Sequence, residues 1–425
     1  MRKKVAAGLL AAGAIGAGAG LLLARQPLGL VADILRAGRA TPEALAILQR
    51  ERLRALIAYA RANSAYYRDL YRDLPEGIDD LAALPVVTKP ELMAHFDEWV
   101  TDPAVTRAGV EAFAADQTLI GRRYLGRYVV WSTSGTTGKP GVFIHDRRAF
   151  LIYEALGMLR CYPRETPVII GSLATRGRIA AVVATGGHFG VNDGIGRWRL
   201  ALPPSQRNRV RLISVLTPLD TLVRELNEFQ PHLLFGYPSN IKLLAGEQRA
   251  GRLRITPHAI FPVGEGLDQA TRSQITAAFH CSPREFYACS EFSYAAFACD
   301  HGWLHVNADW LILEPVDAAY QPVPPGQPSH TALLTNLANY AQPLIRYDLG
   351  DSVTVRPDPC PCGSPLQAIH VEGRTGDILR LRGASGASVA IPPLAIGAVM
   401  EETPGVYRAQ IIQTAPDMLV VRRVT

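Results

Sequence analysis

The chain has 425 residues, of which 48% are hydrophobic and 19% are charged, and its formal net charge is +6. This length is too great for one hydrophobic core, and this composition argues against intrinsic disorder. The basic residues are scattered and do not alternate with aromatic residues, so we expect no nucleic-acid partner. Six cysteines are too few for a disulfide scaffold in a chain of this size.

Residues 1–25 resemble a membrane anchor. Arg2, Lys3 and Lys4 precede an uncharged stretch, residues 5–24, and twenty helical residues span about 30 Å, the thickness of a bilayer's hydrocarbon core. A cleaved signal sequence is the rival interpretation, although no clean small-residue cleavage site precedes Arg25. A misassigned start or an unstructured tail is the third. Residues 26–40 are interpreted as a linker.

The next elements are predicted to be helices. Thr41 is suited to cap a helix whose first residue is Pro42, where the missing N–H does no harm. Apolar residues then recur at helical spacing: Leu45, Leu48, Leu53, Leu56, Ile57 and Ala60. Residues 88–91, Thr-Lys-Pro-Glu, have the form of a capping box that opens a further helix.

Strand-like runs and helical runs alternate through the body of the chain. The expected strands are Tyr128–Trp131, Val168–Leu173, Val210–Leu216, Leu233–Phe235, Ile260–Val263 and Ala332–Leu334. The clearest helix is expected after Thr217 as cap and Pro218, with one apolar face formed by Leu219, Leu222, Val223, Leu226 and Phe229. This alternation predicts an α/β fold with largely parallel sheets.

The most informative stretch is the hydroxyl- and glycine-rich run from Ser132 to Gly141. Glycines let successive backbone N–H groups point into one concavity, hydroxyls add donors, and Lys139 adds a positive charge. These groups predict a polyphosphate site formed by Ser134, Gly135, Thr136, Thr137, Gly138 and Lys139. The run is not a Walker A loop, because Pro140 follows the lysine. A polar hairpin turn is the plainer alternative.

This loop resembles the phosphate-binding loop of the adenylate-forming superfamily. Leu84–Lys89 and Phe235–Ser239 are most similar to the phenylacetate–coenzyme A ligase family, including its capsule-biosynthesis-type members. The resemblance covers roughly residues 41–405. It implies an α/β fold with a large N-terminal body of α/β subdomains, residues 41–376. A hinge and a small, apparently truncated α+β lid, residues 377–425, are expected to follow.

The resemblance also implies roles for further residues. In Tyr287-Ala-Cys-Ser-Glu291, the tyrosine is expected to stack on adenine and Glu291 to help hold Mg²⁺, for which a carboxylate is a suitable ligand. Asp351 is expected to bind the ribose hydroxyls of ATP, and Arg374 to contact the nucleotide beside the hinge. Gly264 and Glu265 resemble a loop that lines the adenine pocket. His188 is expected either to face the channel for the acyl group or the thiol, or to be a half-buried histidine with a structural role.

Cys299, His305, Cys360 and Cys362 form a possible zinc site. Three thiolates and one imidazole make a closed tetrahedral set of the kind used for structural zinc, and His301 is an alternative to His305. Scattered reduced cysteines are the plainer reading. Some members of the resembled family carry zinc at this place, so we expect Zn²⁺ with a folding role.

One part of the resembled pattern is missing. In the superfamily, a lysine late in the lid stabilises the charge that develops during adenylation, but this sequence has no lysine after Lys242. The missing lysine has three interpretations: the sequence is truncated, another group takes the place of the lysine, or the protein is impaired in adenylation.

The resemblance implies an ATP-dependent ligase that joins a carboxylic acid to a thiol, coenzyme A in the first instance. Lys139, Glu291 and Arg374 are the expected catalytic residues. Two alternatives stay open: a membrane-tethered, zinc-containing pseudoenzyme that binds nucleotide without turnover, and an enzyme that passes its acyl group to a sugar, lipid or carrier protein. The need for ATP predicts a cytoplasmic location, with membrane contact through residues 5–24.

Overall fold

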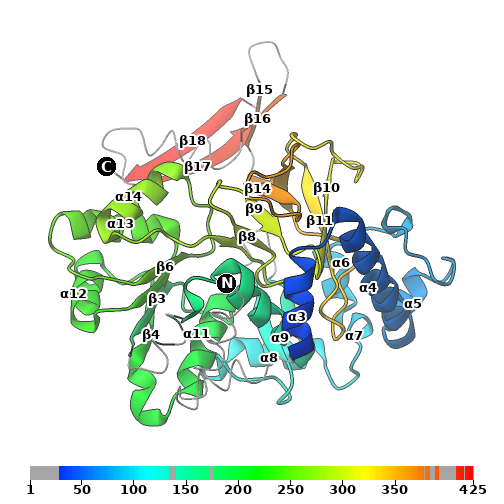
Figure 1. Ribbon diagram of the computed structural model, residues 1–425, viewed down its shortest axis with the longest axis horizontal. Helices are drawn as coiled ribbons and strands as arrows, with labels where there is room; N and C mark the ends of the chain where they lie inside the picture. Colours follow the sequence, from blue (N-terminus) through cyan, green and yellow to red (C-terminus); the bar gives the residue numbers. More distant parts are fainter. Residues whose placement is uncertain are drawn as a thin grey trace.

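The computed structural model describes residues 28–133, 140–167, 169, 171, 177–377, 379–382, 388–391, 408–415 and 417–424 (Figure 1). The expected anchor, residues 5–24, and the phosphate-loop residues 134–139 therefore lie outside the described residues. Among the helices that are described, none has both the length and the apolar character needed to cross a membrane.

The helices follow the apolar spacing of the sequence. Their bounds are α3 (Leu28–Ala37), α4 (Pro42–Asn63), α5 (Ala65–Leu70), α6 (Lys89–Ala94), α7 (Phe96–Trp99), α8 (Arg107–Ala115), α9 (Arg147–Leu156), α11 (Gly190–Ala201), α12 (Leu219–Phe229), α13 (Pro238–Arg249) and α14 (Gln269–Phe279). The predicted cap of α4 is confirmed, since the Thr41 hydroxyl accepts a hydrogen bond from the amide of Ala44 at 3.3 Å. Helix α3 lies within the stretch expected to be a linker, and the carbonyl of its buried Ile34 accepts a hydrogen bond from Arg160.

Four parallel strands form the sheet at the left of Figure 1, in the order β4 (Val210–Ser214), β3 (Ile179–Val183), β5 (Leu233–Gly236) and β6 (Ala259–Pro262). Every residue of β3, β5 and β6 is buried, as expected for strands covered on both faces. One face packs against α12, α13 and α14. The other packs against residues of α11 and residues 161–169.

Antiparallel pairing dominates the rest of the body. A five-stranded sheet has the order β13 (Asp351–Val355), β14 (Ala368–Arg374), β9 (Leu304–Val306), β8 (Ala296–Ala298) and β7 (Phe286–Tyr287). A second sheet joins β10 (Leu311–Val316), β11 (Thr331–Asn336) and β12 (Tyr347–Asp348), and β1 (Val129–Ser132) forms a hairpin with β2 (Val142–His145). These elements and α4 to α9 share the largest hydrophobic core.

The C-terminal part contains two antiparallel hairpins, which project at the top of Figure 1. They are β15 (Leu379–Arg382) with β16 (Ser388–Ile391), and β17 (Arg408–Ala415) with β18 (Met418–Val424). The side-chain amide of Gln413 joins them by accepting from the backbone N–H of Arg380 at 2.9 Å and donating to its carbonyl at 2.6 Å. The predicted fold, a large α/β body followed by a small C-terminal part, is confirmed.

Four local predictions were wrong. The sheets formed by the described residues are not largely parallel, because among them only the β4-β3-β5-β6 sheet is parallel. Residues 169 and 171 are helical where a strand was expected. Pro218, and not Thr217, caps α12, since the Thr217 amide closes a turn onto Ser214. The capping box at Thr88 does not form, because Glu91 accepts a hydrogen bond from the Tyr66 hydroxyl at 2.7 Å.

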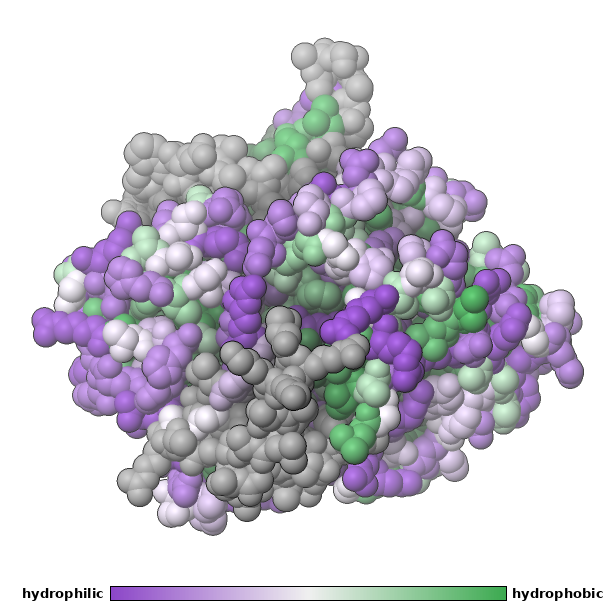
Figure 2. All heavy atoms as spheres, viewed as in Figure 1, coloured by the Kyte–Doolittle hydropathy of each residue, from purple (hydrophilic) through white to green (hydrophobic). Residues whose placement is uncertain are grey.

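Hydrophilic side chains cover most of the face seen in Figure 2, and apolar atoms gather along α3. The exposed apolar residues of that helix include Leu28 and Leu35.

Candidate functional site

The predicted phosphate loop joins the two strands of the β1–β2 hairpin. Ser132 pairs with Val142, and Thr133 then pairs with Gly141 through a backbone bond of 2.9 Å and a second bond, from the Gly141 amide to the Thr133 hydroxyl, of 2.8 Å. These contacts fix both ends of the loop. The loop residues themselves, including Lys139, lie outside the described residues.

Glu291 is a buried carboxylate held by the two antiparallel sheets. Its exposed fraction is 4%, and it accepts a hydrogen bond from the Tyr347 hydroxyl at 2.9 Å. Its backbone carbonyl accepts a second bond from the Asn336 side chain. Burial raises the pKa of Glu291, while the Tyr347 bond and the positive charge of Arg374 oppose this rise. A cation at this carboxylate would remove the cost of its ionisation, which suits it to hold a metal ion.

Asp351, Arg374 and Tyr287 meet beside Glu291. The Arg374 Nε lies 3.1 Å from Asp351 Oδ1, and the Tyr287 hydroxyl donates to Oδ2 of the same carboxylate. Arg374 also donates to the carbonyl of Leu349 at 2.6 Å. Burial raises the pKa of Asp351, and the Arg374 charge and the Tyr287 bond oppose the rise. Tyr287, Asp351 and Arg374, predicted from three separate motifs, are thus paired with one another, and Glu291 lies close enough for the charges of Arg374 and Asp351 to act on it.

The turn between Tyr347 and Asp351 explains how the motif that contains Asp351 and the motif that contains Arg374 come together. Gly350 has φ of +69°, which glycine adopts without strain, and its carbonyl accepts a bond from the Thr375 amide at 2.8 Å. This bond holds the start of β13 against the end of β14, where Arg374 stands.

Gly264 and Glu265 lie at the carboxyl end of the parallel sheet, just after β6. Gly264 has φ of +76°, and a Cβ there would come within 2.9 Å of the Tyr237 ring, so the position requires glycine. The Glu265 carboxylate accepts two bonds from Ser239, from its amide and its hydroxyl, each 3.1 Å. Glu265 therefore joins the segment after β6 to the first turn of α13, which follows β5, at the edge where α/β sheets commonly bind ligands.

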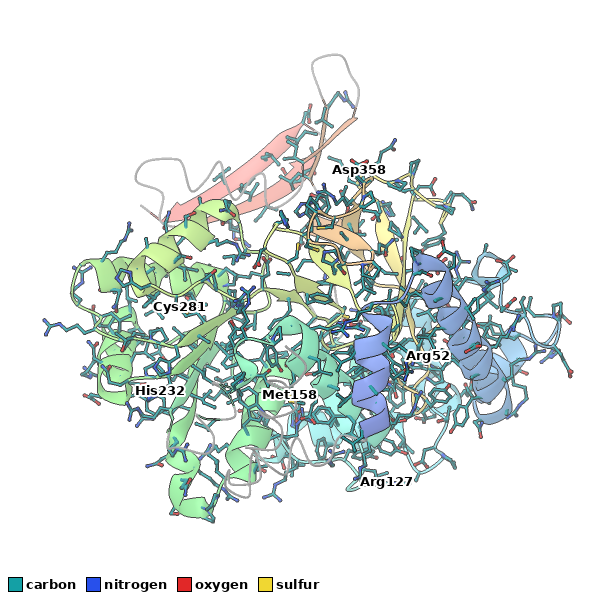
Figure 3. All side chains as sticks on the ribbon, in the orientation of Figure 1. Arg52, Arg127, Met158, His232, Cys281 and Asp358 are labelled. Carbon is teal, nitrogen blue, oxygen red and sulfur yellow. The ribbon has the colours of Figure 1, made fainter. Side chains whose placement is uncertain are left out.

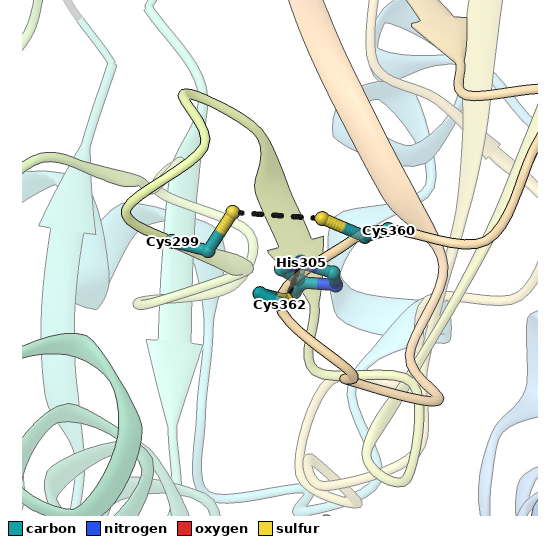
Figure 4. Close-up of side chains that lie close together, drawn as sticks. All are labelled: Cys299, His305, Cys360 and Cys362. Carbon is teal, nitrogen blue, oxygen red and sulfur yellow. Dashed lines mark hydrogen bonds between the residues drawn. The ribbon is translucent and has the colours of Figure 1, made fainter.

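Cys299, His305, Cys360 and Cys362 converge, with their ligand atoms all within 4.8 Å of one another (Figure 4). The Sγ atoms of Cys299 and Cys360 are 3.7 Å apart, close to the ~3.8 Å edge of a tetrahedron with zinc–sulfur bonds of ~2.3 Å. The other pair, Cys362 Sγ and His305 Nε2, is separated by 3.2 Å. His301 is not part of this group.

His305 is oriented for metal binding by its second nitrogen. Its Nδ1 lies 2.9 Å from the Leu366 carbonyl, which can only accept, so Nδ1 carries the proton and Nε2 presents its lone pair to the cysteines. The side chain is fully buried in β9. The donor set, its closeness and this tautomer all fit zinc.

His188 is held in the core. Its side chain is fully buried, its Nε2 lies 2.9 Å from the Asp116 carbonyl, and its ring packs against Phe113. Its own carbonyl accepts a bond from the Ser132 amide. The residue therefore supports the start of the phosphate loop through its backbone and does not line the cavity described next.

A cavity of about 100 Å³ was not predicted from the sequence, and its wall includes Ser293 and Tyr294, which follow Glu291 in the chain. Met158, labelled in Figure 3, is one of its wall residues. Six aromatic residues line it: Trp131, Phe150, Tyr153, Tyr162, Trp198 and Tyr294. Gly190, Gly194, Arg197 and Trp198 on α11 also line it, and their spacing on one helix face was the signal that could have found it.

Known proteins with similar sequences include a coenzyme A ligase and a protein named CapK. The chain is 24% identical over 390 residues to phenylacetate–coenzyme A ligase of Thermus thermophilus, a match that covers 86% of this chain and 77% of the relative. It is 23% identical over 348 residues to protein CapK of Staphylococcus aureus, with coverage of 79% and 69%. No protein-family profile matches the chain.

Similar solved structures show the same fold. They include 2-hydroxyisobutyryl-CoA ligase in the postadenylation state with 2-HIB-AMP, with a TM-score of 0.62 at 21% identity and coverage of 88% of this chain and 77% of that chain. An open conformation of the same ligase with 2-HIB-AMP and CoA gives a TM-score of 0.57, also at 21% identity, over 88% and 83%. The predicted resemblance to the adenylate-forming superfamily and to the phenylacetate–coenzyme A ligase family is confirmed.

Proposed function

Because the chain has the fold of the adenylate-forming ligases, we propose that it is an ATP-dependent acid–thiol ligase. A substrate carboxylate oxygen attacks the α-phosphorus of ATP, the bond to the β-phosphate oxygen breaks, and pyrophosphate leaves. A thiol, coenzyme A, then attacks the acyl carbon and AMP leaves. The observation that carries the proposal is the meeting of Glu291, Asp351, Arg374 and Tyr287 at one place.

The proposed roles follow from the chemistry of these side chains. Glu291, buried and acidic, holds Mg²⁺ on the phosphates. Asp351 accepts hydrogen bonds from the ribose hydroxyls, and Arg374 contacts the nucleotide. Tyr287 stacks on adenine at a pocket that Gly264 and Glu265 also line. The loop Ser134–Lys139 binds the phosphates.

We further propose that the cysteine–histidine group holds a structural Zn²⁺, and that the body at 41–376 is followed by a hinge and lid at 377–425. For the location of the protein, we propose the cytoplasm, with attachment to the membrane through residues 5–24. Its support is the hydrophobic stretch after three basic residues and the need for ATP.

The test is pyrophosphate release by the purified chain with Mg-ATP and a panel of aromatic and aliphatic acids, followed by thioester formation on addition of coenzyme A. Glu291→Gln should reduce release at least about a hundredfold, because a neutral amide is a poor magnesium ligand. Glu98→Gln, an exposed change outside the site, is the control.

Each outcome of this test would favour a different one of the alternative functions. ATP binding without pyrophosphate release for any acid would favour the nucleotide-binding pseudoenzyme, for which the lack of lysine after Lys242 is the motive. Adenylate formation without transfer to coenzyme A would favour a sugar, lipid or carrier-protein acceptor. Unchanged kinetics of Glu291→Gln would remove Glu291 from the metal site.

A further inference from the structure

His145 is a buried histidine to which the proposed function assigns no role. It ends β2, the strand that follows the phosphate loop, and it is fully buried. Its Nε2 lies 3.0 Å from the Ser290 carbonyl, and its Nδ1 lies 3.3 Å from the Tyr153 hydroxyl. Since a carbonyl can only accept, Nε2 carries the proton and donates to Ser290, and Nδ1 accepts from the Tyr153 O–H.

The Tyr153 hydroxyl extends this contact to a second carbonyl. While it donates to His145, it accepts from the side-chain amide of Asn336 at 2.8 Å, and the same amide donates its other hydrogen to the Glu291 carbonyl at 2.9 Å. The amide oxygen of Asn336 accepts from two backbone N–H groups of the turn that follows, which fixes the orientation of the amide. The three side chains thus form one hydrogen-bonded chain that runs from the carbonyl of Ser290 to that of Glu291.

These two carbonyls lie on either side of the Glu291 Cα. The Ser290 carbonyl belongs to the peptide group before this atom, and the Glu291 carbonyl belongs to the peptide group after it. Hydrogen bonds to both peptide groups fix the backbone angles at Glu291, and hence the direction in which its side chain leaves the backbone. The carboxylate itself accepts from the Tyr347 hydroxyl at 2.9 Å. His145 therefore helps to set, through the backbone, where this buried carboxylate points.

His145 also belongs to the hairpin that carries the phosphate loop. Its ring packs on that of Trp131 in β1, with the ring centroids 4.3 Å apart, so it contacts both strands that lead to the loop. In β1, the Ser132 carbonyl accepts a bond from the Ser290 hydroxyl at 3.4 Å. The residue before Glu291 is therefore joined to each strand of the hairpin, to β2 by His145 and to β1 by Ser132.

The chemistry of His145 fits a positioning role. Burial lowers the pKa of His145 to about 3, so the imidazole is neutral at neutral pH. Both ring nitrogens are engaged by the protein, one as a donor and one as an acceptor. A phenyl ring would occupy much of the same space but would leave the Ser290 carbonyl without its donor.

We propose that His145 is a positioning residue, which holds the Glu291 carboxylate in register with the phosphate loop so that both can contact one Mg-ATP. The inference rests on the proposed adenylation function, in which Glu291 holds Mg²⁺ and the loop binds the phosphates. A misplacement of about 1 Å caused by a residue away from the reacting atoms can cost about a hundredfold, so the loss of one backbone contact can have a large effect.

The test measures, by calorimetry on the full chain, the affinity for ATP with Mg²⁺ and with no divalent metal added. The ratio of the two affinities reports the contribution of the metal. We expect His145→Phe to reduce this ratio about ten- to a hundredfold, because the carboxylate moves relative to the phosphates. His145→Gln, whose amide N–H can replace that of Nε2, should restore most of the ratio. His232→Phe, the same exchange at a histidine that accepts from a backbone N–H beside the parallel sheet (Figure 3), should leave it unchanged.

The ratio separates positioning from a general loss of stability, which would weaken ATP binding with and without Mg²⁺ alike. An unchanged ratio in His145→Phe would overturn the inference while pyrophosphate release by the wild-type chain still supported adenylation. If His145→Phe does not fold, Tyr153→Phe removes the hydroxyl that holds Nδ1 and keeps the ring, and an unchanged ratio there would overturn the inference in the same way. Failure of the wild-type chain to bind ATP, together with no pyrophosphate release, would overturn the proposed function and this inference with it.

Discussion

The carboxylate cluster and the cysteine–histidine cluster each bring several ionisable side chains close together, but the charge of the two clusters is balanced in different ways. Around Glu291 and Asp351 the protein supplies its own cation, Arg374, and its own donors, Tyr287 and Tyr347. At Cys299, His305, Cys360 and Cys362, four donor atoms lie within 4.8 Å of one another, and none of the four residues is an arginine or a lysine. The first cluster is balanced without a ligand, whereas the donor atoms of the second cluster are suited to hold a metal ion.

The largest expected effect is a loss of zinc binding and of stability when the cysteine–histidine cluster is broken. Cys360→Ser should abolish binding of one zinc per chain and lower the free energy of unfolding by several kcal/mol, since a structural zinc site contributes its binding energy to folding. Metal analysis and thermal unfolding with and without a chelator measure this. Cys281→Ser, a thiol outside the cluster, should change neither result. A wild-type chain that is purified without zinc and unfolds identically in chelator would refute the site.

Breaking the first cluster should affect nucleotide use more than folding. Asp351→Asn removes the charge that pairs with Arg374 and one of the two oxygen acceptors proposed for the ribose hydroxyls, so we expect KM for ATP to rise about ten- to a hundredfold. Asp317→Asn, an exposed turn residue, is the control. An unchanged KM with a lowered melting temperature would show that the Asp351–Arg374 pair is structural and not part of the nucleotide site.

The sequence predicted the local features that depend on neighbouring residues. Short-range patterns were enough to predict the cap at Thr41 and the buried strands β5 and β6. They were also enough to find the motifs that contain Glu291, Asp351 and Arg374. The capping box failed because Tyr66, 25 positions before Glu91, competes for its carboxylate. The antiparallel sheets and the aromatic cavity were missed because they join residues that are distant in the sequence, as the cavity joins Trp131 and Tyr294.

The smallest expected effect is the pH dependence of magnesium binding at Glu291. Burial raises the pKa of this carboxyl in the folded chain, so below that pKa a proton competes with the metal. Mg-ATP affinity should therefore increase with pH, at most tenfold per unit, up to the raised pKa of Glu291, and then level off. Without metal, the stability of the fold should fall as pH rises from the ordinary glutamate pKa of about 4.3 to the raised pKa, because the folded state favours the protonated carboxyl.

Calorimetric titration of Mg-ATP at several pH values checks this expectation. Subtracting the profile of Glu291→Gln removes the titration of ATP itself. If the two profiles coincide, proton competition at Glu291 plays no part.

The cysteine–histidine cluster also has a consequence for the unfolded chain. Cys299 and Cys360 are 61 positions apart, and the segment between them contains β9, β10, β11, β12 and β13 together with Asp351. An ion bound by both ends closes this segment into a loop, and the chain-entropy estimate for a cross-link of that length is about 4 kcal/mol. Zinc bound at this site would thus act as a reversible cross-link between two distant parts of the chain, a role that a disulfide has in many secreted proteins.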